Sequence, residues 1–178
     1  MRKNWIILIF IISCCPVGKL VAAEIKIGLF YGKNVSTVVF SVVEGEYIIY
    51  GDYREIGSVR KGTIYYIENS NGSLVIQDTS RLLGSFNIIE FRGISTENIF
   101  RLKPVFPSLD AREYDDNVRF QAVLNHISVI NTLNFEKYIA AVTEAEGGPN
   151  AHPEYYKAQA VLIRTFALKN FYRHGSEG

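Results

Sequence analysis

The sequence predicts an α+β fold in which a β-rich N-terminal region of short antiparallel strands precedes two helices. From Glu24 to about Pro107, short apolar runs of period two alternate with turn residues and are rich in Val, Ile, Tyr and Phe. After Asn131 the apolar residues follow a helical spacing over longer segments. The chain has 178 residues, of which 48% are hydrophobic, so it can bury a substantial core.

The first 23 residues have the pattern of an export signal. Arg2 and Lys3 give a positive start, and the apolar run Trp5–Ile12 is too short to span a bilayer but has the length of a signal-peptide core. Small residues favour cleavage after Ala23, whereas the residues around Cys14 are typical of a lipoprotein anchored at that cysteine. Both alternatives predict an exported protein of the periplasm or cell envelope, with transient membrane contact through the signal peptide during export.

The remainder, residues 24–178, carries 16 basic and 18 acidic residues, a formal charge of −2. Because no basic excess is present to neutralise phosphates, nucleic acid is not expected as a partner. Both cysteines lie in the first 23 residues, so a chain cleaved after Ala23 relies on its core and not on disulfides. His126, His152 and His174 are far apart, and no phosphate-binding loop is present. We therefore expect no metal site and no cofactor in this chain.

Nine segments are predicted as strands. Seven of them fall before the prolines near residue 105: Ile25–Tyr31, Val35–Val43, Tyr47–Tyr50, Thr63–Ile67, Leu74–Gln77, Asn87–Phe91 and Ile99–Leu102. Two more follow, at Val118–Leu124 and Ile127–Ile130. Pro104, Pro107 and Ser108 interrupt the pattern, so we predict a boundary between a β-rich region, residues 24–108, and a C-terminal region, residues 109–178.

Two helices are predicted in the C-terminal region. Asn134 is a suitable N-cap for the first, which ends at Gly147-Gly148-Pro149 because these residues favour a left-handed cap and prevent continuation. Proline at the first helical position favours a second helix from Pro153 to about Arg173. Its apolar residues cover most of its circumference, so the second helix is predicted to be largely buried.

Glu146 is the first candidate for catalysis. It lies at the C-terminal end of the first predicted helix, where the negative end of the macrodipole disfavours its anion, a property that suits a general acid. The alternative is a solvated surface glutamate, which is the commoner role of such a residue.

Four residues are candidates for substrate binding. Lys157 and Arg164 are seven residues apart and share one face of the second helix, where they either position a carboxylate or sugar or form a solvent-facing stripe. Gln159 needs hydrogen-bond partners on a largely buried helix, and these are either structural or substrate groups. Tyr138, like Tyr155-Tyr156, either stacks on sugar faces or packs in the core.

An ordered series of residues in the C-terminal region carries a family resemblance. The series is Asn131, Phe135–Tyr138, Val142, Glu146, Lys157–Val161 and Arg164–Asn170. It resembles the stage II sporulation protein D / LytB (SpoIID/LytB) family over roughly Val118 to Arg173. Members of this family are exported envelope proteins that act on peptidoglycan, some as lytic transglycosylases and others as enhancers of a cell-wall amidase. The resemblance therefore implies peptidoglycan glycan strands, and with the enhancers a cell-wall amidase, as partners.

The resemblance also implies a role for Glu146. The catalytic glutamate of the family falls on this position, where it protonates the glycosidic oxygen and then accepts the proton of the sugar's own 6-hydroxyl. The product is a 1,6-anhydro sugar, and no second carboxylate is needed, unlike in an ordinary glycosidase.

The sequence departs from the family pattern at three places. Ala141 stands where glycine is frequent, and Gly147-Gly148 replaces a methionine-proline pair. Longer members continue with a histidine- and cysteine-containing segment, which His174 approaches without cysteine partners. We therefore expect the N-terminal part of the domain, with a metal site that cannot be completed by this chain. Two alternatives to the transglycosylase stay open: a non-catalytic accessory that binds glycan or enhances an amidase, and an inactive truncated fragment.

Overall fold

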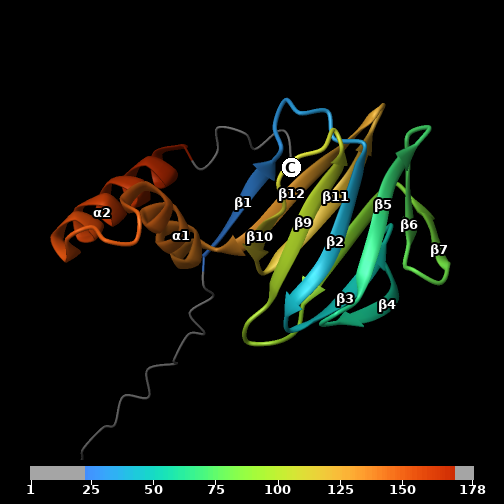
Figure 1. Ribbon diagram of the computed structural model, residues 1–178, viewed down its shortest axis with the longest axis horizontal. Helices are drawn as coiled ribbons and strands as arrows, with labels where there is room; N and C mark the ends of the chain where they lie inside the picture. The colour runs from blue at the N-terminus through green and yellow to red at the C-terminus, as the bar shows by residue number, and fades with distance from the viewer. Residues whose placement is uncertain (1–22, 171–178) are drawn as a thin grey trace, which may run out of the picture.

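A computed structural model describes residues 23–170. Two six-stranded antiparallel sheets pack face to face, and two helices lie at one end of this β-sandwich (Figure 1). The predicted fold class, a β-rich region followed by two helices, is confirmed. Residues 1–22 of the predicted signal peptide, Cys14 among them, lie outside the described residues, as do His174 and the predicted end of the second helix.

Each sheet combines strands that are distant in the sequence. Sheet A has the order β1 (Glu24–Leu29), β12 (His126–Asn134), β11 (Asn117–Val123), β8 (Ile88–Gly93), β3 (Glu46–Gly51) and β4 (Arg54–Arg60). Sheet B has the order β10 (Arg112–Asp115), β9 (Ile99–Phe106), β2 (Thr37–Glu44), β5 (Ile64–Ser70), β6 (Ser73–Gln77) and β7 (Leu82–Phe86).

An aromatic-rich core lies between the sheets. Buried and less buried side chains alternate along β3, as a period-two apolar run requires. Phe40 of β2 stacks on Phe91 of β8 with ring centroids 3.8 Å apart, so this contact joins the two sheets. Phe100 and Phe120 are also fully buried. Burial of a side chain of this size contributes about 1.5–3 kcal/mol, so each of these rings stabilises the sandwich substantially.

The nine predicted strands are all present, and three further strands were missed. The missed strands are β4, β7 and β10, and each lies at an edge of its sheet. Edge strands of natural proteins are often short and charged, which discourages pairing with other chains. The sequences REIGSVR and REYD follow this rule, so they lack the apolar alternation by which strands are recognised.

The sheets also cross the boundary that we predicted near residue 108. Strand β11 pairs with β8, β12 pairs with β1, and β10 pairs with β9. Strands from both sides of residue 108 therefore share each sheet, and the β-sandwich extends to Asn134.

Helix α1 (Phe135–Gly147) begins directly after β12. The side-chain oxygen of Asn134 accepts hydrogen bonds from the backbone N–H groups of Glu136 and Lys137, at 2.8 and 3.3 Å, so the predicted N-cap is confirmed. The backbone N–H of Gly148 donates to the carbonyl oxygen of Glu144 at the other end. Capping residues thus define both ends of α1, as the sequence predicted.

Helix α2 (Pro153–Asn170) is less buried than predicted. Only Ile163 and Ala167 are buried along it, and five large apolar side chains are 45–64% exposed: Tyr155, Val161, Leu162, Phe166 and Leu168. The physical reason is that, among the described residues, α2 packs mainly against α1 and lies to one side of both sheets (Figure 1). A single neighbouring helix covers only one stripe of an apolar circumference. The expectation of a largely buried second helix was therefore wrong.

Candidate functional site

The two helices form an antiparallel hairpin with a small core of its own. Phe135 and Ile139 of α1 pack against Ile163 and Ala167 of α2, and Ile25 of β1 is packed at their edge. This cluster is separate from the core between the sheets. The hairpin is therefore a structural unit that lies at the end of sheet A from which β12 continues into α1.

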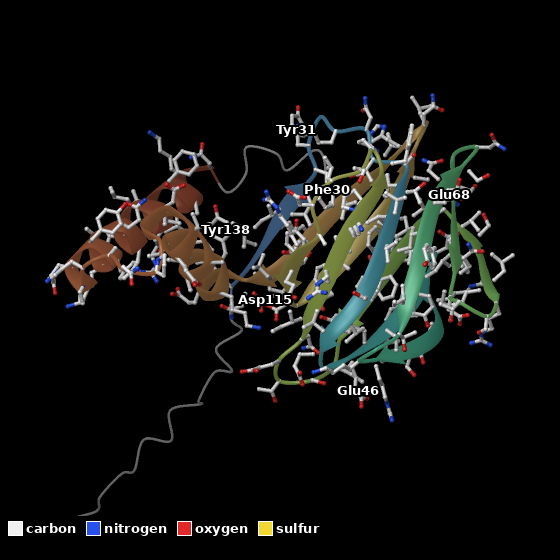
Figure 2. The ribbon with its side chains drawn as sticks, in the orientation of Figure 1. Phe30, Tyr31, Glu46, Glu68, Asp115 and Tyr138 are labelled. Carbon is white, nitrogen blue, oxygen red and sulfur yellow. The ribbon has the colours of Figure 1, made fainter. Side chains whose placement is uncertain are left out.

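Polar contacts attach this hairpin to the sandwich. Asp116 lies between β10 of sheet B and β11 of sheet A, and its carboxylate accepts a hydrogen bond from Asn134 N at 2.9 Å. Its other oxygen lies 2.6 Å from the Nζ of Lys137 in the first turn of α1. Buried Asn131 donates from its amide to the carbonyl oxygens of Asp115 and Asn117, at 2.7 and 2.8 Å. The turn after β10 is thereby held beside the start of α1, where Figure 2 shows Asp115 near the helices.

The charges at this attachment shift two pKa values. Burial lowers the pKa of the Lys137 ammonium. The hydrogen bond to Asp116 and the negative charges of Asp116, Asp115 and Glu97 together raise this pKa by more, so it lies above its usual value. Burial raises the pKa of the Asp115 carboxyl, which Lys137 opposes and which Asp116 and Glu97 reinforce. Asp115 and Lys137 both lie beside the start of α1, whereas Glu146 lies in its last turn. The two pKa shifts therefore belong to the structural attachment of the hairpin.

Glu146, the predicted catalytic residue, lies in the last turn of α1 and is exposed to solvent. Within residues 23–170 its carboxylate has no hydrogen-bond or ion-pair partner. A carboxylate at the C-terminal end of a helix lies at the negative end of the macrodipole. Within the described residues no cation pairs with Glu146 to offset this effect. Glu146 is thus accessible to a ligand and is not committed to the fold.

The turn after Glu146 is held by Tyr156. Its hydroxyl group donates a hydrogen bond to the carbonyl oxygen of Gly148 and accepts one from Ala151 N at 3.1 Å. A Cβ atom at Gly147 would lie 2.6 Å from the Tyr156 ring and 3.2 Å from the Tyr155 ring. Gly148 has a φ of 65°, in the region that favours glycine. Both glycines that depart from the family pattern therefore have a local structural cause.

The three candidate tyrosines have different surroundings. Tyr138 is half-buried and stacks on Phe135 with centroids 6.4 Å apart, so it packs against the hairpin core (Figure 2). Tyr156 is half-buried at the turn. Tyr155 is 45% exposed and contacts Tyr156 edge-on, and its ring is near Gly147, the residue after Glu146. Tyr155 is therefore the tyrosine best placed to contact a ligand at Glu146.

Both predicted substrate-binding cations form ion pairs within the hairpin. Lys157 pairs with Glu154 one turn earlier on α2, with Nζ and Oε1 2.8 Å apart and both side chains exposed. Arg164 pairs with Glu136 in the first turn of α1. Ten residues of helix separate Glu136 from Glu146, which is about 15 Å. The hairpin thus places Lys157 near the Glu146 end and Arg164 at the opposite end.

Gln159 is half-buried on α2, and its side chain makes no hydrogen bond to the part of the chain that the structure describes. Among residues 23–170, no group of three or more histidine, cysteine, aspartate or glutamate side chains is arranged to hold a metal ion. None of the helices in that range has the length and apolar character needed to cross a membrane.

Residues 124–178 match the SpoIID family model, described as stage II sporulation protein. The C-terminal segment is SpoIID-like. The match includes all of β12, both helices and all five predicted site residues. It indicates a function related to the cell wall. No curated protein and no solved structure matches the chain.

The SpoIID segment begins at Leu124, so most of the β-sandwich lies before it. Lys137, within the segment, was missed as a structural residue by sequence reasoning. Its partner Asp116 precedes the segment and is 21 residues away in the chain, a separation that no local pattern reports.

Proposed function

We propose that this protein is an exported cell-wall protein that acts on the glycan strands of peptidoglycan as a lytic transglycosylase. The observation that carries the proposal is the unpaired, exposed carboxylate of Glu146 at the end of α1, inside the SpoIID segment. The family resemblance supports this residue as the acid and base of the reaction.

In the proposed reaction, the protonated Glu146 carboxyl donates its proton to the oxygen between two sugars as the glycosidic bond breaks. The C6 hydroxyl oxygen of the same sugar forms a bond to C1, and its proton passes to the Glu146 carboxylate. The residue returns to its starting form, and the products are a 1,6-anhydro end and a free hydroxyl end. One carboxyl group is sufficient because the nucleophile belongs to the substrate.

The neighbours of Glu146 support such a role. The exposed ring of Tyr155 offers a face on which a sugar can stack. The hydrogen bonds of Tyr156 hold the turn that follows Glu146. The ion pair of Lys157 with Glu154 is exposed, and such a pair contributes at most about 1 kcal/mol, so Lys157 can exchange it for a substrate group. For Arg164 we propose a positioning role, because its partner Glu136 is at the far end of α1.

The test is release of anhydro sugars from peptide-free glycan strands by wild type and by Glu146→Gln. Glu144→Gln is the matched control, since Glu144 is also exposed on the last turns of α1. Loss of general acid catalysis should lower the rate about 100-fold or more in Glu146→Gln and leave Glu144→Gln near wild type. Equal release by Glu146→Gln and wild type would rule out the catalytic role.

A second candidate is a non-catalytic accessory that binds glycan or enhances a cell-wall amidase. It is favoured by the ion pairs of Lys157 and Arg164, which occupy both cations expected at the substrate. An accessory predicts no anhydro product from wild type, and it predicts that Glu146→Gln retains glycan binding and amidase stimulation.

A further inference from the structure

The outer face of sheet A carries a groove of about 310 Å³ that none of the residues discussed for catalysis lines. It runs across β1, β12, β11 and β8, and its lining includes Lys26, Glu90, Arg92, Arg119, Ile130 and Thr132. All of it except Ile130 and Thr132 comes from the chain before the SpoIID segment. The groove is therefore a feature of the β-sandwich and distinct from the Glu146 turn.

Two arginines share one carboxylate in this groove. Arg92 donates from Nε to Glu90 at 2.9 Å and also pairs through Nη2. The Nε of Arg119 is buried without a hydrogen bond and lies 3.6 Å from Glu90, beyond hydrogen-bonding distance. Glu90 is thus committed to Arg92, and its single negative charge is opposed by two guanidinium groups.

The groove consequently has an excess of positive charge. Lys26 on β1 adds a third cation and has no ion-pair partner among residues 23–170, while Glu24 adds the second carboxylate of the lining. Three cations face two carboxylates in the lining of the groove, so an anionic group is favoured there. Arg92 donates from Nε and Nη2 to Glu90, so Nη1 is the nitrogen from which it can donate a charge-assisted hydrogen bond to a ligand carboxylate.

Tyrosine rings lie against the same arginines. The Arg92 guanidinium is 4.4 Å from the centre of the Tyr50 ring. Arg119 is 5.8 Å from the centre of the Tyr53 ring and donates to its hydroxyl group at 3.0 Å. These contacts orient both guanidinium groups and place apolar ring surface beside them, an arrangement suited to the C–H faces of sugars.

Tyr53 adopts a backbone conformation that its residue type disfavours. It follows Asp52 in the two-residue turn between β3 and β4, and both have positive φ, 46° and 67°. The second position of such a turn prefers glycine, and a bulky residue there is strained by about 1 kcal/mol or more. Tyr53 is nevertheless 64% exposed, so core packing does not explain its presence. Its ring and hydroxyl group instead contact Arg119 at the groove.

We propose that this groove binds a carboxylate-bearing stretch of saccharide chain, as a glycan contact separate from Glu146. The carboxylate pairs with Arg92 and Lys26, hydroxyl groups bond to Thr132, and the sugar rings lie against Tyr53 and the apolar floor at Ile130. The identity of the ligand as wall glycan rests on the proposed function. A site on the sandwich holds a polymeric substrate while the helical hairpin acts on another part of it.

The experiment compares binding of peptide-free wall glycan, which carries a carboxylate on alternate sugars, with N-acetylglucosamine oligomers, which carry none. The first variant is Tyr53→Gly, which relieves the positive-φ strain, so it should melt no lower than wild type while losing the ring. The second is Arg92→Gln, with Arg101→Gln as its control. The Arg101 side chain is 51% exposed, as is that of Arg92, and it pairs with Glu113 on sheet B.

We expect wild type to bind the carboxylated glycan about ten-fold more tightly than the carboxyl-free oligomers, because charge-assisted hydrogen bonds to Arg92 are lost in the latter. Tyr53→Gly and Arg92→Gln should each lose about five-fold or more in affinity, and Arg101→Gln should match wild type. Equal affinity of all variants, or equal binding of the two glycans, overturns the proposal.

Different measurements test the proposed function and the groove, so the failure of one can be told from the failure of the other. If Glu146→Gln releases as much anhydro sugar as wild type, or wild type releases none, catalysis at Glu146 is refuted. Loss of glycan affinity in Arg92→Gln would still support the groove. If the full chain cuts glycan with unaltered affinity in both groove variants, the groove is refuted and the catalytic proposal stands.

Discussion

The ammonium group of Lys137 lies 2.6 Å from the carboxylate of Asp116, and this ion pair joins the helical hairpin to the β-sandwich. Both side chains are partly shielded from solvent, at 35% and 19% exposure. The same carboxylate accepts a hydrogen bond from the backbone of Asn134, the N-cap of α1. One aspartate therefore fixes the start of the hairpin by charge and by backbone hydrogen bonding together.

Replacing this aspartate by asparagine should lower the free energy of unfolding by about 1–2 kcal/mol, because a charge-assisted hydrogen bond becomes a neutral one. Asparagine tolerates the φ of 64° at position 116, so backbone strain does not contribute. Urea unfolding of Asp116→Asn measures the loss. Lys157→Met, which breaks the exposed pair with Glu154, is the control and should cost less than about 0.5 kcal/mol. Equal losses in the two variants would contradict the structural role of Asp116.

Stability should depend on the ionisation of Asp78 in acid. Hydrogen bonds from the Ser80 side chain and from the backbone of Ser80 and Arg81 hold the pKa of this carboxyl below its usual value of 3.8. Because the folded-state pKa is the lower one, the stabilisation is present above 3.8 and is lost as the pH falls through the folded-state pKa. Asp78→Asn keeps an oxygen acceptor and does not titrate.

The urea midpoints of wild type and Asp78→Asn should therefore differ at neutral pH and converge as the pH falls through the folded-state pKa of Asp78. Taking the difference between the two proteins cancels the titration of every other group. A difference that stays constant over this range would show that the Asp78 hydrogen bonds do not favour the ionised form.

Gly147→Ala should destabilise the hairpin although alanine is the better helix former. The added Cβ would lie 2.6 Å from the Tyr156 ring, which the hydrogen bond to Gly148 holds in place. Displacing a packed ring costs about 1–3 kcal/mol, more than the roughly 1 kcal/mol that alanine contributes by propensity. Faster amide hydrogen exchange in α1 and α2 measures the effect. Gly57→Ala, where the Cβ meets open space, should leave exchange in the helices unchanged.

The exposed apolar face of α2 should make the protein associate or bind hydrophobic dyes. Leu162 and Phe166 are 63% and 64% exposed on this face, and a contiguous apolar patch of this kind is rare on a monomeric surface. Leu162→Gln with Phe166→Gln should reduce dye binding and concentration-dependent association without lowering the melting temperature. Ile163→Gln, at a buried position, should instead lower the melting temperature. A loss of stability in the exposed double variant would mean that this face is covered.

Much of this structure was readable from local sequence patterns. The period-two runs predicted nine strands, and Asn134, Gly148 and Pro153 predicted both ends of α1 and the start of α2. Each of these signals acts within a few residues, through backbone conformation or through one hydrogen bond. The ordered motif from Asn131 to Asn170 likewise predicted the SpoIID-like segment, and the family match confirms it.

By itself, then, the sequence determined the order and type of the main elements, the capping of α1 and the family of the C-terminal segment. The tertiary structure alone decided the partners of the long side chains and the exposure of each face. Arg164 was predicted either to position a substrate or to face solvent, and the antiparallel hairpin brings it to Glu136, 28 residues away. Arg92 and Arg119 come together only because β8 and β11 are neighbours in sheet A. The burial of α2 was predicted wrongly for the same reason. The apolar residues around a helix show how much surface it could bury, whereas the elements that pack against it decide how much it does bury.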